Sequence, residues 1–99
     1  MDFEGQVVDA ISQSGENFDG SGPFGFMGFD ILLTARIVAV ADAFINLTSP
    51  RGANLGFELA TNRLLNDSGT KYDRKVVSAL LNYLENGGGM ERWARFREA

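Results

Sequence analysis

Hydrophobic positions along this chain recur at the three- to four-residue spacing of α-helices, in segments that glycine-rich stretches separate. No segment alternates convincingly between apolar and polar residues with the two-residue period of a half-buried strand. The pattern therefore predicts an all-α fold, a small bundle of about four to five helices with a long glycine-rich loop. The expected helices cover residues 4–13, 31–48 and 57–65, a segment that starts after Asp73 and reaches Leu84, and a terminal segment from Met90.

The segment 31–48 gives the clearest helical signal. It is rich in alanine, leucine and isoleucine, contains neither glycine nor proline, and stops just before Ser49-Pro50. Apolar residues lie on almost every side of it, which predicts a central, buried helix. Residues 15–29, in contrast, hold five glycines and Pro23, so we expect an irregular loop there.

Ninety-nine residues suffice for a single domain, 1–99, with one modest core. Within it, residues 86–99 are expected to form a flexible link at the glycine triplet and then a terminal amphipathic helix. The N-terminus is acidic and has no apolar signal-peptide core, and Arg36 and Asp42 interrupt the most apolar run. We therefore expect a cytoplasmic protein with no membrane span.

Charge and composition exclude several classes of function. The net charge is -4, which argues against a nucleic-acid partner, because proteins that bind a phosphate backbone carry an excess of basic residues. The chain has no cysteine and no histidine. It therefore lacks a thiolate nucleophile, the usual general base and the usual zinc or iron ligand.

The glycine loop contains a literal match to the dinucleotide-binding pattern G-x-G-x-x-G, from Gly20 to Gly25. That pattern binds a pyrophosphate only where a strand precedes it and a helix starts within it. Here a helix is predicted before the loop, and Pro23 interrupts the pattern. We therefore do not interpret it as a nucleotide site.

Asp42 falls between Val38 and Ile45 on one side of the apolar helix. A carboxylate in such a place is costly unless it is paired or bound to a metal. Two interpretations stay open. In the first, Asp42 is a metal ligand or a general base. In the second, it is a core aspartate bonded to backbone, to Arg36 or to Arg51, and the residues alone favour this second interpretation.

Aromatic residues and methionine gather in two places that could bind a protein partner. One is the loop, where they either pack beneath it or point outward to a partner, and the pattern favours neither. The other is the terminal helix, which either folds back on the core or presents an exposed patch. The candidate partner-binding residues are Phe24, Phe26, Met27, Phe29, Trp93 and Phe96.

Three stretches of the chain, at residues 16–23, 30–44 and 69–77, resemble motifs of HD-GYP domains, which belong to the HD superfamily of metal-dependent phosphohydrolases. Residues 16–23, E-N-F-D-G-S-G-P, are similar to the H-H-E-x-x-D-G-x-G-Y-P signature. Residues 30–44, D-I-L-L-T-A-R-I-V-A-V-A-D-A-F, resemble a late helix of the family, and residues 69–77 resemble its G-T-x-F-D-P-x-V-V stretch. The three matches follow the family order and together cover residues 5 to about 84. The resemblance implies an HD-domain-like half.

The departures from the family pattern bear on catalysis. The paired histidines of the signature fall on Ser14 and Gly15, neither of which binds iron, manganese or zinc as imidazole does. Of the ligand positions that the resemblance implies, only Asp42 is retained, and one carboxylate cannot hold a two-metal site. We therefore predict no catalytic residues, no metal site, no cofactor and no enzyme activity.

The leading hypothesis is a truncated, catalytically inactive HD-GYP-like module for protein interaction and regulation in bacterial signalling. In the family this half packs against preceding helices, so we expect exposed apolar faces at 7–11 and 31–47, covered by a homodimer or by a partner of response-regulator or GGDEF type. A second hypothesis is a sensor that binds a cyclic dinucleotide without hydrolysis, through phosphate contacts of Arg36, Arg51 and Arg63. The third is a fragment of a metal-dependent cyclic di-GMP phosphodiesterase whose histidines come from another chain.

Overall fold

The computed structural model describes the backbone of residues 2–98 and the side chains of residues 2–95. The described residues form helices and contain no strand. The all-α prediction is therefore confirmed. The elements are α1 (Phe3–Gln13), a short 3-10 turn η1 (Gly28–Asp30), α2 (Leu33–Thr48), α3 (Phe57–Asn66), α4 (Arg74–Asn86) and α5 (Gly89–Glu98).

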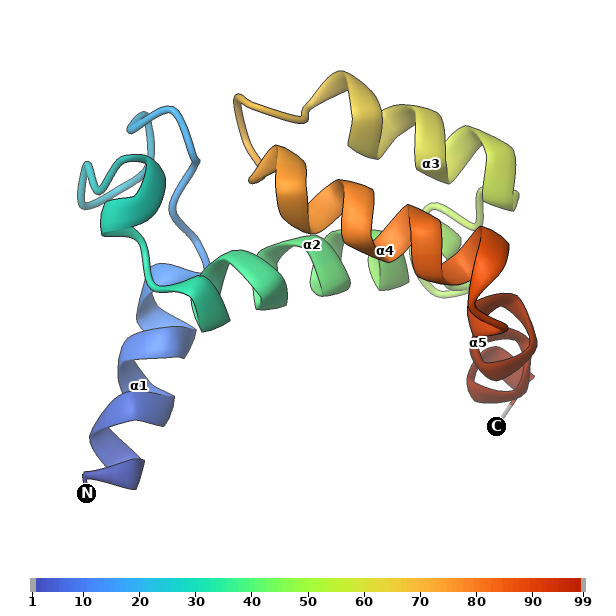
Figure 1. The fold of residues 1–99 in the computed structure, drawn as a ribbon, viewed down its shortest axis with the longest axis horizontal. Coiled ribbons are helices and arrows are strands. Elements are labelled where there is room, and N and C mark those ends of the chain that lie inside the picture. The colour runs from blue at the N-terminus through green and yellow to red at the C-terminus, as the bar shows by residue number, and fades with distance from the viewer. Residues whose placement is uncertain (1, 99) are drawn as a thin grey trace.

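The helices form an arch, which Figure 1 shows from the side. α2 is the span of the arch, α4 packs along it, and α3 packs on both of them. α1 and α5 project from opposite ends of the span toward the same side and make its two legs. None of the helices in the described part of the chain is long and apolar enough to cross a membrane.

The hydrophobic core lies between α2, α3 and α4. Its aromatic end joins Phe44 of α2, Phe57 of α3 and Trp93 of α5, and the centroid of the Trp93 ring lies 5.4 Å from that of Phe44. Trp93 thereby holds α5 to the end of the bundle, so the terminal helix folds back on the core. The buried cluster consists of Val40, Phe44, Ala60, Leu64, Val77 and Leu84.

α2 differs from its prediction in two respects. It begins at Leu33 rather than at residue 31, because Ile31 has extended backbone angles and its carbonyl accepts a hydrogen bond from Nε of Arg36 (2.9 Å). It is also not buried on every side. Only Ala35, Val40, Phe44 and Thr48 of α2 are buried. The expectation of a fully buried central helix is therefore wrong, because α3 and α4 cover only one side of α2.

The glycine-rich loop between α1 and α2 is hydrogen-bonded to the turn that precedes α4. The backbone N–H groups of Phe18 and Asp19 donate to the carbonyls of Lys71 (3.1 Å) and Thr70 (2.9 Å). The loop closes on itself where Gly28 N–H donates to the Phe18 carbonyl (2.8 Å). Gly28 has a φ of 57°, in the left-handed region that glycine adopts without steric cost. The loop is therefore folded, and it positions its aromatic residues.

Candidate functional site

A stripe of apolar side chains along the uncovered side of α2 is the most extensive candidate surface. Leu33, Ile37, Ala41 and Ile45 follow one another at intervals of four residues, which places them on one ridge of the helix. Leu33 is 55% exposed, Ile37 47% and Ile45 40%. Val38, on the neighbouring ridge, is also exposed. We call these five residues the α2 stripe.

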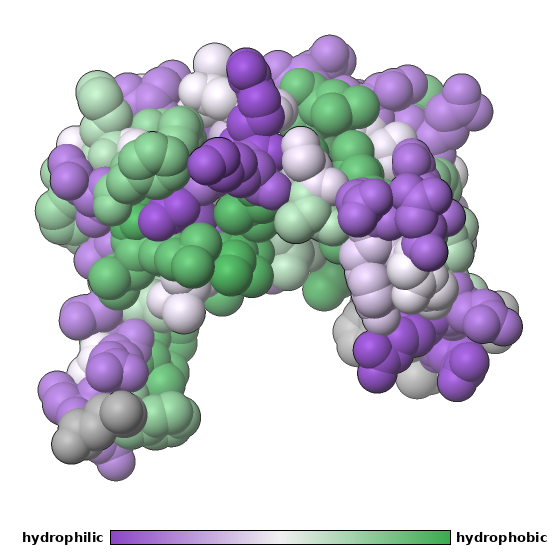
Figure 2. Space-filling view, in the orientation of Figure 1, coloured by the Kyte–Doolittle hydropathy of each residue, from purple (hydrophilic) through white to green (hydrophobic). Residues whose placement is uncertain are grey.

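The α2 stripe continues into α1 at one end. No residue of α1 is buried, and Phe3, Val8 and Ile11 are each more than 60% exposed. Phe3, Val7 and Ala10 line a groove with Leu32, Leu33 and Thr34 at the start of α2. Figure 2 shows apolar residues along the edge where α1 meets α2 and a hollow between the two legs. The expectation that apolar faces at 7–11 and 31–47 are exposed is therefore confirmed.

At its other end the α2 stripe runs into a second apolar groove. Ala41 and Ile45 line it together with residues of α4 and α5. Arg92 stands at this groove, where it donates to the hydroxyl oxygen of Tyr83 (3.0 Å). The stripe shares Leu33 with the first groove and Ala41 and Ile45 with the second. We call the stripe and the two grooves together the underside. The groove at α5 is lined by Ala41, Phe44, Ile45, Leu80, Tyr83, Leu84, Gly89, Arg92 and Trp93.

Asp42 lies exposed on α2, one helical turn after Val38. The expectation of a core aspartate is therefore wrong. Its proposed partner Arg36 pairs with Asp73 instead, and Arg51 is exposed in the turn that follows α2. No group of three or more acidic, cysteine or histidine side chains that could hold a metal ion occurs among the residues the structure describes.

The family positions for paired histidines lie at the end of α1. The hydroxyl of Ser14 donates to the carbonyl of Ile11 (2.7 Å), which is the ordinary arrangement of a serine at a helix end. Gly15 has no side chain and no heavy atom within 4 Å of the place where its Cβ would be. This end of α1 therefore offers a hydroxyl and backbone groups.

The loop presents its aromatic residues to solvent. Phe24 is 67% exposed, Met27 58% and Phe29 70%, and Phe26 is exposed as well. Both carboxylate oxygens of the buried Glu16 accept hydrogen bonds at 2.9 Å, from the backbone N–H groups of Phe24 and Phe26. The loop side chains therefore point outward and do not pack beneath the loop. Trp93, the candidate in the terminal helix, packs against the core instead. The Phe96 side chain lies outside the described residues.

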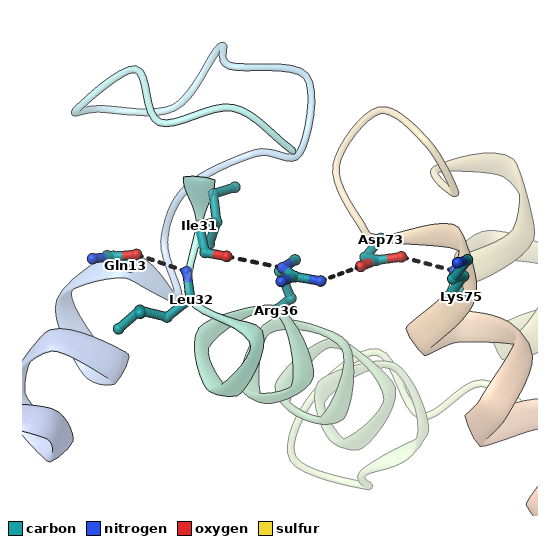
Figure 3. A network of polar contacts seen from close by, with 6 residues as sticks. All are labelled: Gln13, Ile31, Leu32, Arg36, Asp73 and Lys75. Atoms are coloured by element: carbon teal, nitrogen blue, oxygen red, sulfur yellow. Dashed lines mark hydrogen bonds and ion pairs between the residues drawn. The ribbon is translucent and has the colours of Figure 1, made fainter. Parts of the chain in front are cut away.

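Arg36 connects three parts of the fold through a network that the sequence did not indicate (Figure 3). Its Nη1 lies 2.7 Å from Oδ2 of Asp73, and the two side chains are 13% and 4% exposed. Oδ1 of Asp73 accepts from the Lys75 N–H (2.8 Å), which caps α4. The Arg36 guanidinium also lies 5.1 Å from the centroid of the Phe29 ring. Arg36 thus serves as an internal support rather than as a free phosphate contact.

The three arginines proposed as phosphate contacts have separate surroundings. Arg36 is paired with Asp73, and Arg63 lines a groove of its own with Asp67 and Lys71. Arg51 is exposed beyond the end of α2. The structure therefore shows no common anion site that all three would form.

The Asp73 carboxylate makes a testable contribution to pH-dependent stability. Burial raises its pKa, but the hydrogen bonds from Arg36 and from the Lys75 N–H outweigh burial and hold the pKa below the ordinary 3.8. A lowered pKa in the folded state stabilises the fold above the unfolded pKa, and this contribution is lost as pH falls through the folded value. We expect the stability advantage of the wild type over Asp73→Asn, measured by urea unfolding, to be constant from pH 7 to 5 and to shrink below pH 3.8.

Comparison with known proteins relates this arrangement to one family. Residues 1–76 match a family model described as an HD domain. The crystal structure of a cyclic GMP-AMP specific phosphodiesterase of V. cholerae (V-cGAP3) is similar, with a TM-score of 0.77 and 27% sequence identity. The match covers 86% of this chain and 20% of that chain, so this chain spans about a fifth of its length. No curated protein matches the chain.

Proposed function

This chain belongs to the HD domain family, and from that premise we propose that it acts as a catalytically inactive protein-interaction module with a regulatory role in bacterial signalling. The observation that carries the proposal is the apolar underside, which runs from α1 along the α2 stripe to α5. Contiguous apolar surface of this kind on a folded domain marks a site where another molecule binds.

The residues of this chain do not fit the metal ions that the HD-GYP resemblance implies. A two-metal site needs several ligands around two ions that lie about 3.5–4 Å apart. Ser14 and Gly15 offer no imidazole, and Asp42 belongs to no group of three or more potential metal ligands among the described residues. These residues therefore offer no support for a metal-dependent hydrolytic step, and Asp42 remains an exposed carboxylate on α2.

Burial of the underside would supply the driving force for association. Each fully buried leucine, isoleucine or valine contributes about 1.5–3 kcal/mol relative to an exposed one. Leu33 and Ile37 of the α2 stripe and Phe3 of α1 are roughly half exposed or more, so a partner gains from covering them. The loop tip at Phe24 and Phe26 adds a second, separate surface with the aromatic composition of interface centres. Proteins of response-regulator or GGDEF type are the partner classes that the family resemblance suggests.

The absence of catalysis is tested by assaying the purified chain against cyclic GMP-AMP and cyclic di-GMP, with manganese, iron and magnesium supplied in turn. We expect no product above the metal-only blank, because imidazole ligands are missing. V-cGAP3 serves as the positive control. Turnover that disappears in Asp42→Ala would contradict the proposal and favour the phosphodiesterase alternative.

The same two nucleotides, titrated calorimetrically into the chain without metal, test the sensor alternative. We expect no saturable heat, because Arg36 is occupied by Asp73 and Arg63 lies in a separate groove. Saturable binding that Arg51→Ala or Arg63→Ala weakens would replace the interaction module by a nucleotide sensor.

A further inference from the structure

The two legs of the arch differ in charge. α1 and its capping residue carry Asp2, Glu4 and Asp9 and no basic residue. α5 carries Arg92 and Arg95 beside Glu91, so its described side chains are net basic. Figure 1 places these legs at opposite ends of α2. The apolar underside therefore has an acidic end and a basic end.

α1 has little support within its own chain. It has 11 residues and none of them is buried, and α2 is the helix that it packs against. Isolated helices shorter than about 12–15 residues are marginal in water, so most helical stability has to come from packing of an apolar face. Val8 and Ile11 of α1 are exposed, and Figure 2 shows apolar residues along the side of α1 that faces the hollow between the legs. A neighbour that packs there would stabilise the helix.

We propose that the occupant of the underside is a second copy of this chain, related by a two-fold axis that crosses the α2 stripe near Ile37 and Ala41. This inference rests on the proposed function and names its partner. The two α2 helices run antiparallel, and each α1 lies beside α5 of the other copy. Phe3, Val8 and Ile11 of one copy then reach the groove at Trp93 and Tyr83 of the other.

The charge pattern selects this arrangement over the alternatives. A two-fold axis across the middle of the stripe exchanges its ends, so the acidic leg of each copy meets the basic leg of the other. A parallel arrangement would set the acidic α1 legs against each other, and like charges across an interface oppose association. A partner with a uniformly basic or acidic surface would be attracted to one end of the underside and repelled by the other.

The underside is large enough for such a dimer. The molecule measures 33 Å along its longest axis and 27 Å along its shortest, and α2 with its two legs lies along the longest axis. A stable interface buries roughly 800 Å² per partner, which fits within this face. The i±4 ridges of the α2 stripe allow two such helices to interdigitate at their crossing point.

Sedimentation velocity of two charge-reversed variants tests the dimer and its geometry. Glu4→Lys with Asp9→Lys makes both legs basic, and Arg92→Glu with Arg95→Glu makes both legs acidic. We expect the wild type to be a dimer, and each variant to dimerise at least about tenfold more weakly, because opposite charges become like charges. An equimolar mixture of the two variants is expected to recover the wild-type affinity, since each acidic leg again meets a basic one.

Two further variants separate the interface from general effects on folding. Ile37→Glu, at the centre of the stripe, should abolish the dimer, whereas Leu59→Glu, 59% exposed on α3, should leave it unchanged. Circular dichroism verifies that each variant is folded. A wild type that stays monomeric at concentrations near 100 μM, or a mixture that does not recover affinity, overturns the proposed dimer. A monomer without hydrolytic activity would contradict the dimer but not the interaction module, whose partner would then be another protein. Turnover of a cyclic dinucleotide would contradict the interaction module itself.

Discussion

Replacement of Arg36 by methionine is expected to lower the free energy of unfolding by about 3–5 kcal/mol, the cost of leaving a buried carboxylate without its partner. The Asp73 side chain is only 4% exposed, and Nη1 of Arg36 is 2.7 Å from it. The variant also loses the hydrogen bond to the Ile31 carbonyl and the contact with the Phe29 ring. Urea unfolding monitored by circular dichroism measures the loss.

The exposed ion pair between Lys71 and Asp67 provides the matched control. Its atoms are 4.0 Å apart and its side chains are 58% and 39% exposed, so Lys71→Met should cost less than about 1 kcal/mol. The double variant Arg36→Met with Asp73→Asn should recover part of the loss, because the buried charge is then gone. Equal losses for Arg36→Met and Lys71→Met would contradict the role assigned to the buried pair.

Leu64→Ala is expected to cost about 2–5 kcal/mol, the range for a leucine removed from a packed core. Leu64 is fully buried in the cluster between α2, α3 and α4. A domain of this size has about 5–15 kcal/mol of net stability, so the variant should be close to unfolding at physiological temperature. Thermal denaturation measures the shift of the midpoint.

The neighbouring Leu65 isolates the contribution of burial. It sits on the same helix and differs only in facing outward, with 50% of its surface exposed. We expect Leu65→Ala to change the free energy of unfolding by less than about 1 kcal/mol. If the two substitutions cost the same, the core does not lie where the structure places it.

Local sequence patterns predict most of the helices of this fold correctly. The predicted helices 4–13 and 57–65 agree with α1 and α3 to within one residue at each end, and Asp73 caps α4 as its position indicates. The helix predicted from residue 31 begins two residues later, at Leu33, because the Ile31 backbone is extended and its carbonyl accepts a hydrogen bond from the Arg36 side chain. Helical periodicity alone cannot show such a contact.

The sequence predicts the candidate site less well than it predicts the helices. Apolar residues on all sides of 31–48 indicate a buried helix, but they do not show which other helices are present to cover it. Only the family resemblance indicates that one apolar side of this helix is exposed. The sequence offers Arg36 as one of several possible partners of the nearby Asp42, yet Arg36 pairs with Asp73, which lies 37 residues away in the chain. Pairing across that separation depends on how the helices pack, and nothing local marks it.

The buried Glu16 has a consequence for molecular recognition at the loop tip. Because its carboxylate already fixes the backbone at Phe24 and Phe26, the loop loses little conformational entropy when those rings are captured. A ligand that contacts the two rings therefore binds a pre-organised surface rather than a mobile loop. The acidic residue retained from the family signature thus supports rigid display, a use that requires no chemistry at the carboxylate itself.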